Sequence, residues 1–363
     1  MKAIKVNLKN RSYDIIVGPG IIKLLPAFIA KLGIGNSAYI ITNARIKNKY
    51  GAALNKILKR AGFNARFKTI PDTEKSKSIG KAGLLIKDIA HYDKRRRTFI
   101  VAFGGGVIGD LAGFIASIYK RGAPYIQIPT TLLAQVDSAI GGKTGVDLPE
   151  AKNLVGAFYQ PRLVLSDVGF LKSLPKRQIR AGLAEVIKYG LIKDRVLFYF
   201  LERNYRDIIK LNPVSFEYII ERSSRIKAAI VASDEREEKG LRTILNFGHT
   251  IGHAIEAASH YKLYNHGEAI ALGMLVASDI SRSLNLITGN VHKRIENLIK
   301  LSGLPSRIKG VGLRNIINAH YRDKKFIGSK NRFVLIKGIG KTKIIENIPL
   351  KIIKEAVGKR CAP

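Results

Sequence analysis

The segment TFIVAFGGGVIGDLAGFIASIY (98–119) decides the fold class of this chain. Its apolar run 98–103 is typical of a buried strand, and residues 110–119 have the pattern of a helix. Between them, GGGVIG (104–109) matches G-x-G-x-x-G, in which glycine lets a pyrophosphate approach the positive end of the following helix. The segment therefore predicts a strand–turn–helix unit that binds a dinucleotide, with a purely structural glycine turn as the alternative.

Two features of this segment differ from the simple dinucleotide fingerprint. The motif follows several earlier strands, and the next strand ends at Pro129-Thr130-Thr131 with no acid to hold a ribose. Asp110 directly follows the turn, where a carboxylate would repel a pyrophosphate. We expect Asp110 to point at the nicotinamide ribose or at the substrate instead.

Strand and helix patterns alternate around this segment. A helical stretch ending near Gly62 and an amphipathic stretch at 76–92 lie among short apolar runs typical of buried parallel strands. These runs are 38–42, 63–70, 125–129 and 163–167, and the leading segments KAIKVNL (2–8) and YDIIVG (13–18) predict an edge hairpin. The alternation predicts a doubly wound, Rossmann-like α/β domain with a mostly parallel sheet.

After about residue 176 the pattern changes to long amphipathic helices. These are expected at 177–192, 195–210, 214–238, 248–259, 267–285 and 289–302, with a late hairpin at 333–337 and 343–346. We therefore expect an α/β domain at 1–175 and a mainly α-helical domain at 176–363, with the functional site in a cleft between them.

Composition excludes several classes of protein. No apolar run reaches the roughly 20 residues of a membrane span, and the first residues lack the apolar stretch of a signal peptide. The single cysteine, Cys361, excludes an intrachain disulfide, which favours a cytoplasmic protein. The net charge of +36 is dispersed, with no nucleic-acid-binding motif, so we expect it to attract anionic substrates and predict no specific nucleic-acid binding.

A histidine-rich segment, NFGHTIGHAIEAASHYKLYNHGE (246–268), holds four of the seven histidines of the chain and indicates a metal site. His249 and His253 share a helix face, and with Glu256 they form one possible ligand set, while His266 offers a further ligand. The metalloprotease pattern fails because no glutamate stands between the histidines at the required position.

Glu185 and Lys188 lie one turn apart on a partly buried helix face, so the carboxylate needs a lysine, a metal or a hydrogen-bond donor. Glycine-rich segments at 135–147 and 150–161 look like loops that could carry polar side chains to a substrate. Those side chains are Asp137, Lys143, Lys152 and Asn153, and solvated loop charge is the alternative explanation for each.

The whole chain resembles the 3-dehydroquinate synthase family, and the match rests on many motifs in order. They are PDTEKSK (71–77), AFGGGVIGDLAGFIASIYKRG (102–122), IPTTLLAQVDSAIGGKTGVD (128–147), KNLVGAFYQP (152–161), AGLAEVIKYG (181–190), LNFGHTIGHAIE (245–256) and HGEAIALGM (266–274). The wider superfamily includes glycerol-dehydrogenase-like enzymes and other sugar phosphate cyclases.

The resemblance implies a zinc or cobalt ion held by Glu185, His249 and His266, which places His253 on the substrate side. It implies NAD contacts at Asp72, Thr73, Glu74, Lys75, Ser76, Lys77, Gly106, Val107, Ile108, Gly109, Asp110, Thr130, Thr131, Lys143, Lys152, Phe170, Leu171, Lys172 and Ser173. It implies substrate contacts at Asp137, Lys143, Asn153, Lys188, Lys227, Arg242, Asn246, His253 and one lysine of the pair Lys324-Lys325, for which we choose Lys325. Arg121 resembles a residue that reaches the neighbouring subunit's site, so a homodimer is expected.

The two departures from the family pattern are small. Family members usually have glycine at Thr73, which affects the turn near Glu74, and threonine at Ser173, which retains a hydroxyl.

The implied activity is the conversion of 3-deoxy-D-arabino-heptulosonate 7-phosphate to 3-dehydroquinate and phosphate, a step of the shikimate pathway to aromatic amino acids. It would proceed by transient oxidation with NAD, phosphate elimination, re-reduction and aldol closure. Another sugar phosphate cyclase and an NAD-dependent polyol dehydrogenase are the alternatives.

Overall fold

The computed structural model describes residues 1–94, 96–322 and 331–362. The chain forms two compact units, Met1–Leu174 with Phe216–Arg236 and Pro175–Ser215 with Glu237–Pro363. The expected division near Pro175 lies where the chain first passes from one unit to the other. It is wrong for residues 216–236, which belong to the first unit because the chain returns to it.

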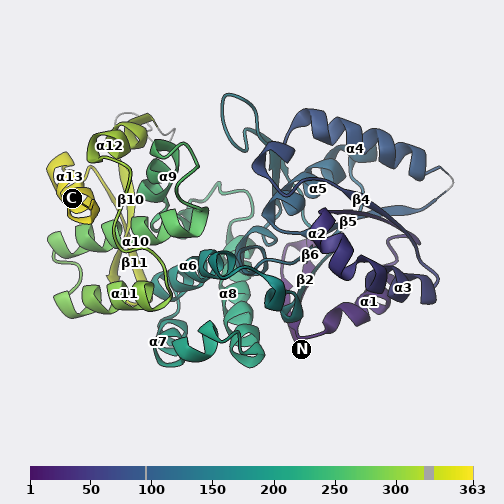
Figure 1. Cartoon of the computed structure of the whole chain (residues 1–363), viewed down its shortest axis with the longest axis horizontal. Coiled ribbons are helices and arrows are strands. Elements are labelled where there is room, and N and C mark those ends of the chain that lie inside the picture. Colours follow the sequence, from purple (N-terminus) through teal and green to yellow (C-terminus); the bar gives the residue numbers. More distant parts are fainter. Residues whose placement is uncertain (95, 323–330, 363) are drawn as a thin grey trace. The chain divides into compact units, whose positions relative to one another are not determined.

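The first unit is built on a seven-stranded sheet (Figure 1). In spatial order its strands are β1 (Lys2–Val6), β2 (Tyr13–Gly18), β9 (Leu163–Asp167), β6 (Tyr125–Pro129), β5 (Thr98–Gly104), β3 (Ser37–Thr42) and β4 (Asn64–Thr69). Only the β1–β2 pair is antiparallel, which confirms the predicted edge hairpin and the mostly parallel sheet. Every residue of β3, β6 and β9 is buried, as expected of strands covered on both faces.

Helices cover this sheet. They are α1 (Leu25–Leu32), α2 (Ala44–Ile46), α3 (Ala52–Arg60), α4 (Ile79–Tyr92) and α5 (Gly106–Ile118), and the later part of α8 (Pro213–Ser233) belongs to the same unit. Short 3-10 or π segments lie between or next to these strands and helices, at Lys9–Arg11, Ile21–Leu24, Lys47–Gly51, Glu74–Ser76, Tyr119–Arg121, Ala134–Ser138 and Val168–Ser173.

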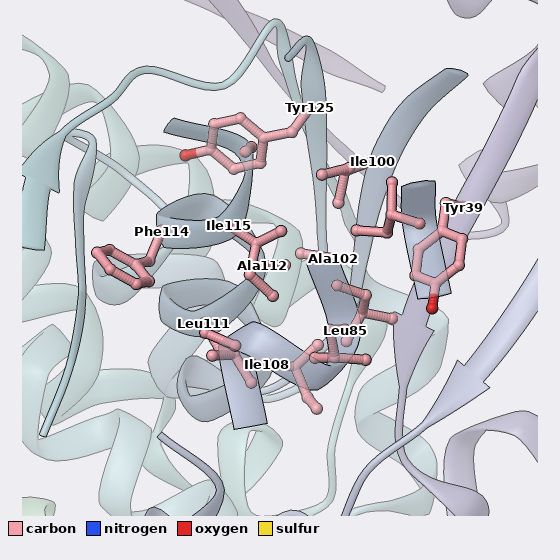
Figure 2. Close-up of a cluster of buried hydrophobic side chains, with 14 of the residues drawn as sticks. Tyr39, Leu85, Ile100, Ala102, Ile108, Leu111, Ala112, Phe114, Ile115 and Tyr125 are labelled. Atoms are coloured by element: carbon pink, nitrogen blue, oxygen red, sulfur yellow. The ribbon is translucent and has the colours of Figure 1, made fainter. Parts of the chain in front are cut away.

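Helix α5 packs its apolar face on the sheet and forms much of one core cluster (Figure 2). Ile108, Leu111, Ala112 and Ile115 are buried against strand residues such as Ile100. At roughly 1.5–3 kcal/mol for each large apolar side chain, this burial fixes the start of α5 relative to the end of β5.

The glycine-rich segments after β6 were expected to be loops, and that expectation is wrong in part. Residues Lys143–Val146 (β7) and Val155–Phe158 (β8) form an antiparallel hairpin. Small glycines allow the two backbones to approach each other: a Cβ on Gly156 would lie 2.2 Å from the Thr144 carbonyl oxygen. Lys152 and Asn153 therefore lie on the connection between two paired strands.

The second unit is mainly helical, as predicted, and contains α6 (Lys176–Ile192), α7 (Arg195–Ile209), α9 (His249–Ala258), α10 (His266–Ser283) and α11 (Gly289–Leu301). A 3-10 segment (Leu241–Asn246) precedes α9, and β10 (Arg332–Gly338) with β11 (Lys341–Glu346) forms the predicted late hairpin. Helices α12 (Leu313–Arg322) and α13 (Leu350–Arg360) were not predicted. In the part of the chain that the structure describes, no helix combines the length and apolarity needed to span a bilayer.

Candidate active site

The residues expected to contact NAD gather at the carboxyl edge of the parallel sheet. Strand β3 pairs with β4 on one side and β5 on the other, so the chain reverses its direction of winding between β3 and β5. Ligands of open α/β sheets bind at such a switch point, outside the carboxyl ends of the strands. The glycine turn follows β5 at this point, which explains why it need not open the first βα unit.

Two opposing effects act on Asp110: burial disfavours its charged form and raises its pKa, while a neighbouring lysine partly offsets this. Its Oδ2 atom pairs with Lys77 Nζ at 2.8 Å, and the same ammonium donates to Asn153 Oδ1 at 2.6 Å. Burial disfavours the charged form of Lys77, but Asp110 and Glu74 outweigh it and raise the pKa of Lys77. The acid beside the glycine turn is therefore held in an ion pair.

One residue at this edge was missed by the sequence analysis. Asn43 follows β3, caps α2 by accepting from Ile46 N at 2.8 Å, and donates from Nδ2 to Asp72 Oδ2 at 3.0 Å. An asparagine directly after an apolar strand run was the available signal. Ser173, the second family departure, accepts from Tyr50 Oη at 3.0 Å, so its hydroxyl is part of a hydrogen-bonded pair.

Other expected substrate residues of the first unit form a second polar group. Lys227 on α8 donates to both Oδ1 and the main-chain oxygen of Asp137, each at 2.7 Å. Lys143 begins β7 and is exposed, and Arg121 is exposed in a turn where Lys120 (φ 51°) and Arg121 (φ 64°) both adopt the left-handed region. Residues other than glycine rarely adopt this backbone conformation, so the surrounding structure must hold the turn in place.

In the second unit, Glu185, His249 and His266 come together from α6, α9 and α10. Both histidine Nε2 atoms lie 3.6 Å from Glu185 Oε1, and one ligand atom from each residue lies within 4.8 Å of the others. Zinc bonds of about 2.0–2.2 Å in a tetrahedron separate neighbouring ligand atoms by roughly 3.4 Å. The donor set and its spacing therefore fit a zinc or cobalt ion.

Close helix contacts bring these candidate ligands together. A Cβ on Gly267, next to His266, would lie 2.3 Å from the backbone oxygen of Ala181 in α6. A Cβ on Gly273 would lie only 1.9 Å from the Gly248 oxygen, at the start of α9. Glycine at these positions lets α10 approach α6 and α9 closely, which brings Glu185, His249 and His266 near one another.

Burial and neighbouring charges shift the pKa values of the two histidines in opposite directions. Glu185 is fully buried, and Lys188 Nζ forms an ion pair with it. Burial, aided by Lys188 and His266, lowers the pKa of His249 well below its usual value, so its ring is neutral. Burial also disfavours the charged form of His266, but the carboxylates of Glu185 and Glu256 outweigh it and raise the pKa of His266 to about 10.

The remaining expected substrate residues of this unit lie near the same helices. The His253 ring is 5.3 Å from the His249 ring, and Asn246 ends the 3-10 segment before α9. Arg242, which is 3% exposed, pairs through Nε with Glu237 Oε1 at 3.3 Å. Lys325 lies outside the described residues.

Comparison with known proteins identifies the family. The model "3-dehydroquinate synthase N-terminal" matches residues 67–181, and "3-dehydroquinate synthase C-terminal" matches residues 182–326. The chain belongs to the 3-dehydroquinate synthase family. It is 42% identical to 3-dehydroquinate synthase of Desulforamulus reducens over 349 residues, 96% of this chain and 97% of that protein. The expected enzyme class, a phosphate-eliminating cyclase, is thereby confirmed.

Solved structures of related cyclases share the fold of this 3-dehydroquinate synthase family member. A 2-deoxy-scyllo-inosose synthase with carbaglucose-6-phosphate, NAD+ and Co2+ matches with a TM-score of 0.90 and 26% identity, covering 99% of this chain and 100% of that one. A 2-epi-5-epi-valiolone synthase from Streptomyces hygroscopicus with NAD+ and Zn2+ matches with a TM-score of 0.88 and 28% identity, covering 97% and 98%. Both neighbours thus hold the two cofactors expected from the sequence.

Proposed function

We propose that this chain converts 3-deoxy-D-arabino-heptulosonate 7-phosphate to 3-dehydroquinate and inorganic phosphate, with NAD regenerated in each cycle. The observation that carries the proposal is the convergence of Glu185, His249 and His266, within 4.8 Å of one another, in a chain that matches 3-dehydroquinate synthases along its length. The related cyclases that bind NAD+ with Co2+ or Zn2+ support the choice of cofactors.

Glu185, His249 and His266 would hold the metal ion, and the carboxyl edge of the first sheet would hold NAD. When bound, the metal supplies polarisation of a substrate hydroxyl, and NAD accepts and returns a hydride. The first unit would contribute the glycine turn and the segments at Asp72–Lys77, Thr130–Thr131, Lys152 and Phe170–Ser173 to NAD binding. These roles rest on the family resemblance and on the shared edge of the sheet.

The substrate carries a carboxylate and a phosphate, so its site needs several cations. We propose that Lys143, Lys227, Arg242 and Lys188 bind these anionic groups, where charge-assisted hydrogen bonds are strong. Ion-pair partners hold three of them in place, since Lys227 pairs with Asp137, Arg242 with Glu237 and Lys188 with Glu185. Asn153, Asn246, His253, Arg121 and Lys325 complete the proposed substrate set.

His253 has a separate role in this proposal. It is close to His249 and His266 but outside the ligand triad, so we propose that its imidazole contacts the substrate, where it can donate or accept a proton. The late ring closure requires mainly a pocket that fixes one conformer of the open intermediate. A cytoplasmic location and a homodimer completed by Arg121 remain part of the proposal.

The decisive experiment measures phosphate release from the heptulosonate substrate with NAD and Zn2+ present. The proposal expects phosphate and 3-dehydroquinate in equal amounts, no net accumulation of NADH, and loss of activity on chelation that Zn2+ restores. Stoichiometric NADH would instead indicate a polyol dehydrogenase. Inactivity on this substrate, with turnover of another sugar phosphate, would indicate a different cyclase of the kind that the solved neighbours represent.

A further inference from the structure

His266 takes part in two groups of side chains that could each hold a metal ion. One is the triad with Glu185 and His249, and the other consists of His253, Glu256 and His266. The two ring nitrogens of His266 face different carboxylates: Nε2 lies 3.6 Å from Glu185 Oε1, and Nδ1 lies 3.4 Å from Glu256 Oε1. The question is whether these are two metal sites or one.

The chemistry of imidazole favours one site. A neutral ring has a single unprotonated nitrogen, and its other nitrogen carries a proton that it can only donate. If Nε2 binds an ion together with Glu185 and His249, then Nδ1 is protonated and cannot be a ligand. A carboxylate facing that N–H is its natural acceptor, and such pairs orient the histidine and increase its basicity as a ligand.

We propose that Glu256 is a positioning residue of the metal centre, which accepts the Nδ1 proton of His266 and thereby directs Nε2 toward the ion. His253, Glu256 and His266 then form no second metal site. The inference rests on the proposed ligand triad but not on the identity of the substrate.

The two ligand histidines differ in how they are held. His249 Nδ1 faces the carbonyl oxygen of Phe247 at 3.2 Å, so its own backbone segment orients it. His266 begins α10 after a capping box, in which Asn265 and Glu268 exchange hydrogen bonds of 2.9 and 3.0 Å. This box fixes the backbone but not the ring.

The ring of His266 is also the more exposed of the two, at 33% against 13% for His249. It therefore gains more from a side-chain partner. Glu256, itself only 12% exposed, projects from α9 two turns after His249 and supplies that partner from a rigid element.

The test measures binding of Co2+ and Zn2+ to the full chain by competition with a chromogenic chelator. Variants are Glu256→Leu, which removes the acceptor, Glu256→Gln, which retains an acceptor oxygen, and Glu185→Gln, which removes a proposed ligand. Glu202→Gln is the matched control, because Glu202 is a partly buried glutamate of the same unit that pairs with Arg294 instead of a histidine. Thermal unfolding identifies any variant that is simply misfolded.

We expect one equivalent of metal in the wild-type chain and an affinity about 10–100-fold lower in Glu256→Leu, the usual effect of losing such a partner. Glu256→Gln should recover part of the affinity, and the visible d–d spectrum of bound Co2+ should change in Glu256→Leu but not in Glu202→Gln.

Three results would overturn the inference. Unchanged affinity and spectrum in a folded Glu256→Leu, with affinity lost in Glu185→Gln, would overturn it while leaving the proposed metal site intact. Two bound equivalents, of which Glu256→Leu removes only one, would show that the second group is a separate site. Metal binding that Glu185→Gln leaves unchanged would overturn both this inference and the proposed ligand triad.

Discussion

Lys77 Nζ donates to Asn153 Oδ1 at 2.6 Å, which fixes the direction of the asparagine amide. An ammonium can only donate, so the oxygen of Asn153 must face Lys77, and its NH2 group points elsewhere as a donor. That donor is what a phosphate or carboxylate of the proposed substrate requires. A buried lysine that we propose to bind NAD thus also orients a residue that we propose to bind the substrate.

Replacing Lys77 with methionine should therefore reduce stability and weaken binding of both ligands. Loss of one partner from a buried ion pair costs about 3–5 kcal/mol, because Asp110 is left without its cation. Thermal unfolding, NAD titration and KM for the heptulosonate substrate measure these effects. The double variant Lys77→Met/Asp110→Asn should be less destabilised than the sum of its single variants.

Lys87→Met is the control for this prediction, since Lys87 is an exposed lysine on α4. If both lysine variants behave alike, Lys77 does not organise the site.

Two single substitutions, one of a proposed metal ligand and one of a proposed substrate residue, should have different effects on metal binding and on turnover. Glu185→Gln preserves side-chain volume but removes the buried charge, so metal affinity should fall by more than the roughly 100-fold expected of a supporting residue. His253→Ala should retain the metal and lower kcat/KM by the equivalent of about 1.5–3 kcal/mol, the contribution of a charged hydrogen bond. Equilibrium dialysis measures metal binding in each variant, and steady-state kinetics measures turnover. If His253→Ala loses the metal and Glu185→Gln retains it, His253 belongs to the ligand set.

The close contact between α9 and α10 predicts that a larger residue at Gly273 strongly destabilises the protein. Alanine there would place Cβ 1.9 Å from the Gly248 oxygen, so the helices must separate. We expect a loss of about 1–3 kcal/mol of stability or more, with weaker metal binding because His249 directly follows Gly248. Urea unfolding and metal titration measure these effects.

Gly289→Ala, at the start of α11, meets no atom nearer than 3.9 Å and should change stability little. A Gly273→Ala variant as stable as Gly289→Ala would contradict the close packing.

Sequence patterns predicted the sheet because each buried strand is a continuous apolar run, and such runs depend on local composition. They could not select among the candidate metal ligands. His249, His253 and Glu256 share one face of a helix, so spacing alone favoured them, whereas Glu185 reaches the site from α6 through the close contact of Gly267 with Ala181. The partner of Asp110 could not be predicted from these patterns either, because Lys77 lies on a different connection, between β4 and α4.

The loss of stability of the second unit at low pH should depend on Asp279. This buried carboxylate on α10 contacts His292 Nε2 at 2.8 Å and Arg360 Nη2 at 3.1 Å. Burial opposes its ionisation, but hydrogen bonds with His292 and Arg360 outweigh it and lower the pKa of Asp279. Because the pKa of Asp279 is lowered in the folded state, its ionised form stabilises the fold at pH values above the ordinary aspartate pKa of about 3.9. This contribution is lost as the pH falls through the lower pKa of the folded state.

Asp279→Asn should therefore be less stable than the wild type by about 3–5 kcal/mol at neutral pH, and the difference should shrink below pH of about 4. Urea midpoints across this pH range measure it. Asp207→Asn alters an exposed carboxylate on α7 and should stay within about 0.5 kcal/mol of the wild type. A difference that is constant with pH would exclude ionised Asp279 as the cause.

The return of the chain to its first unit through α8 limits how the protein can be divided. A fragment that ends at Leu174 lacks Phe216–Arg236, and with it Lys227, the partner of Asp137. It also loses Glu235, which binds Arg11 at 2.7 Å and Gln160 at 3.0 Å. Limited proteolysis or recombinant halves cut at the first boundary should therefore yield an incomplete first unit. Expression of the first unit alone would instead require a linker that joins Leu174 directly to Phe216 and so keeps the later part of α8 in the fragment.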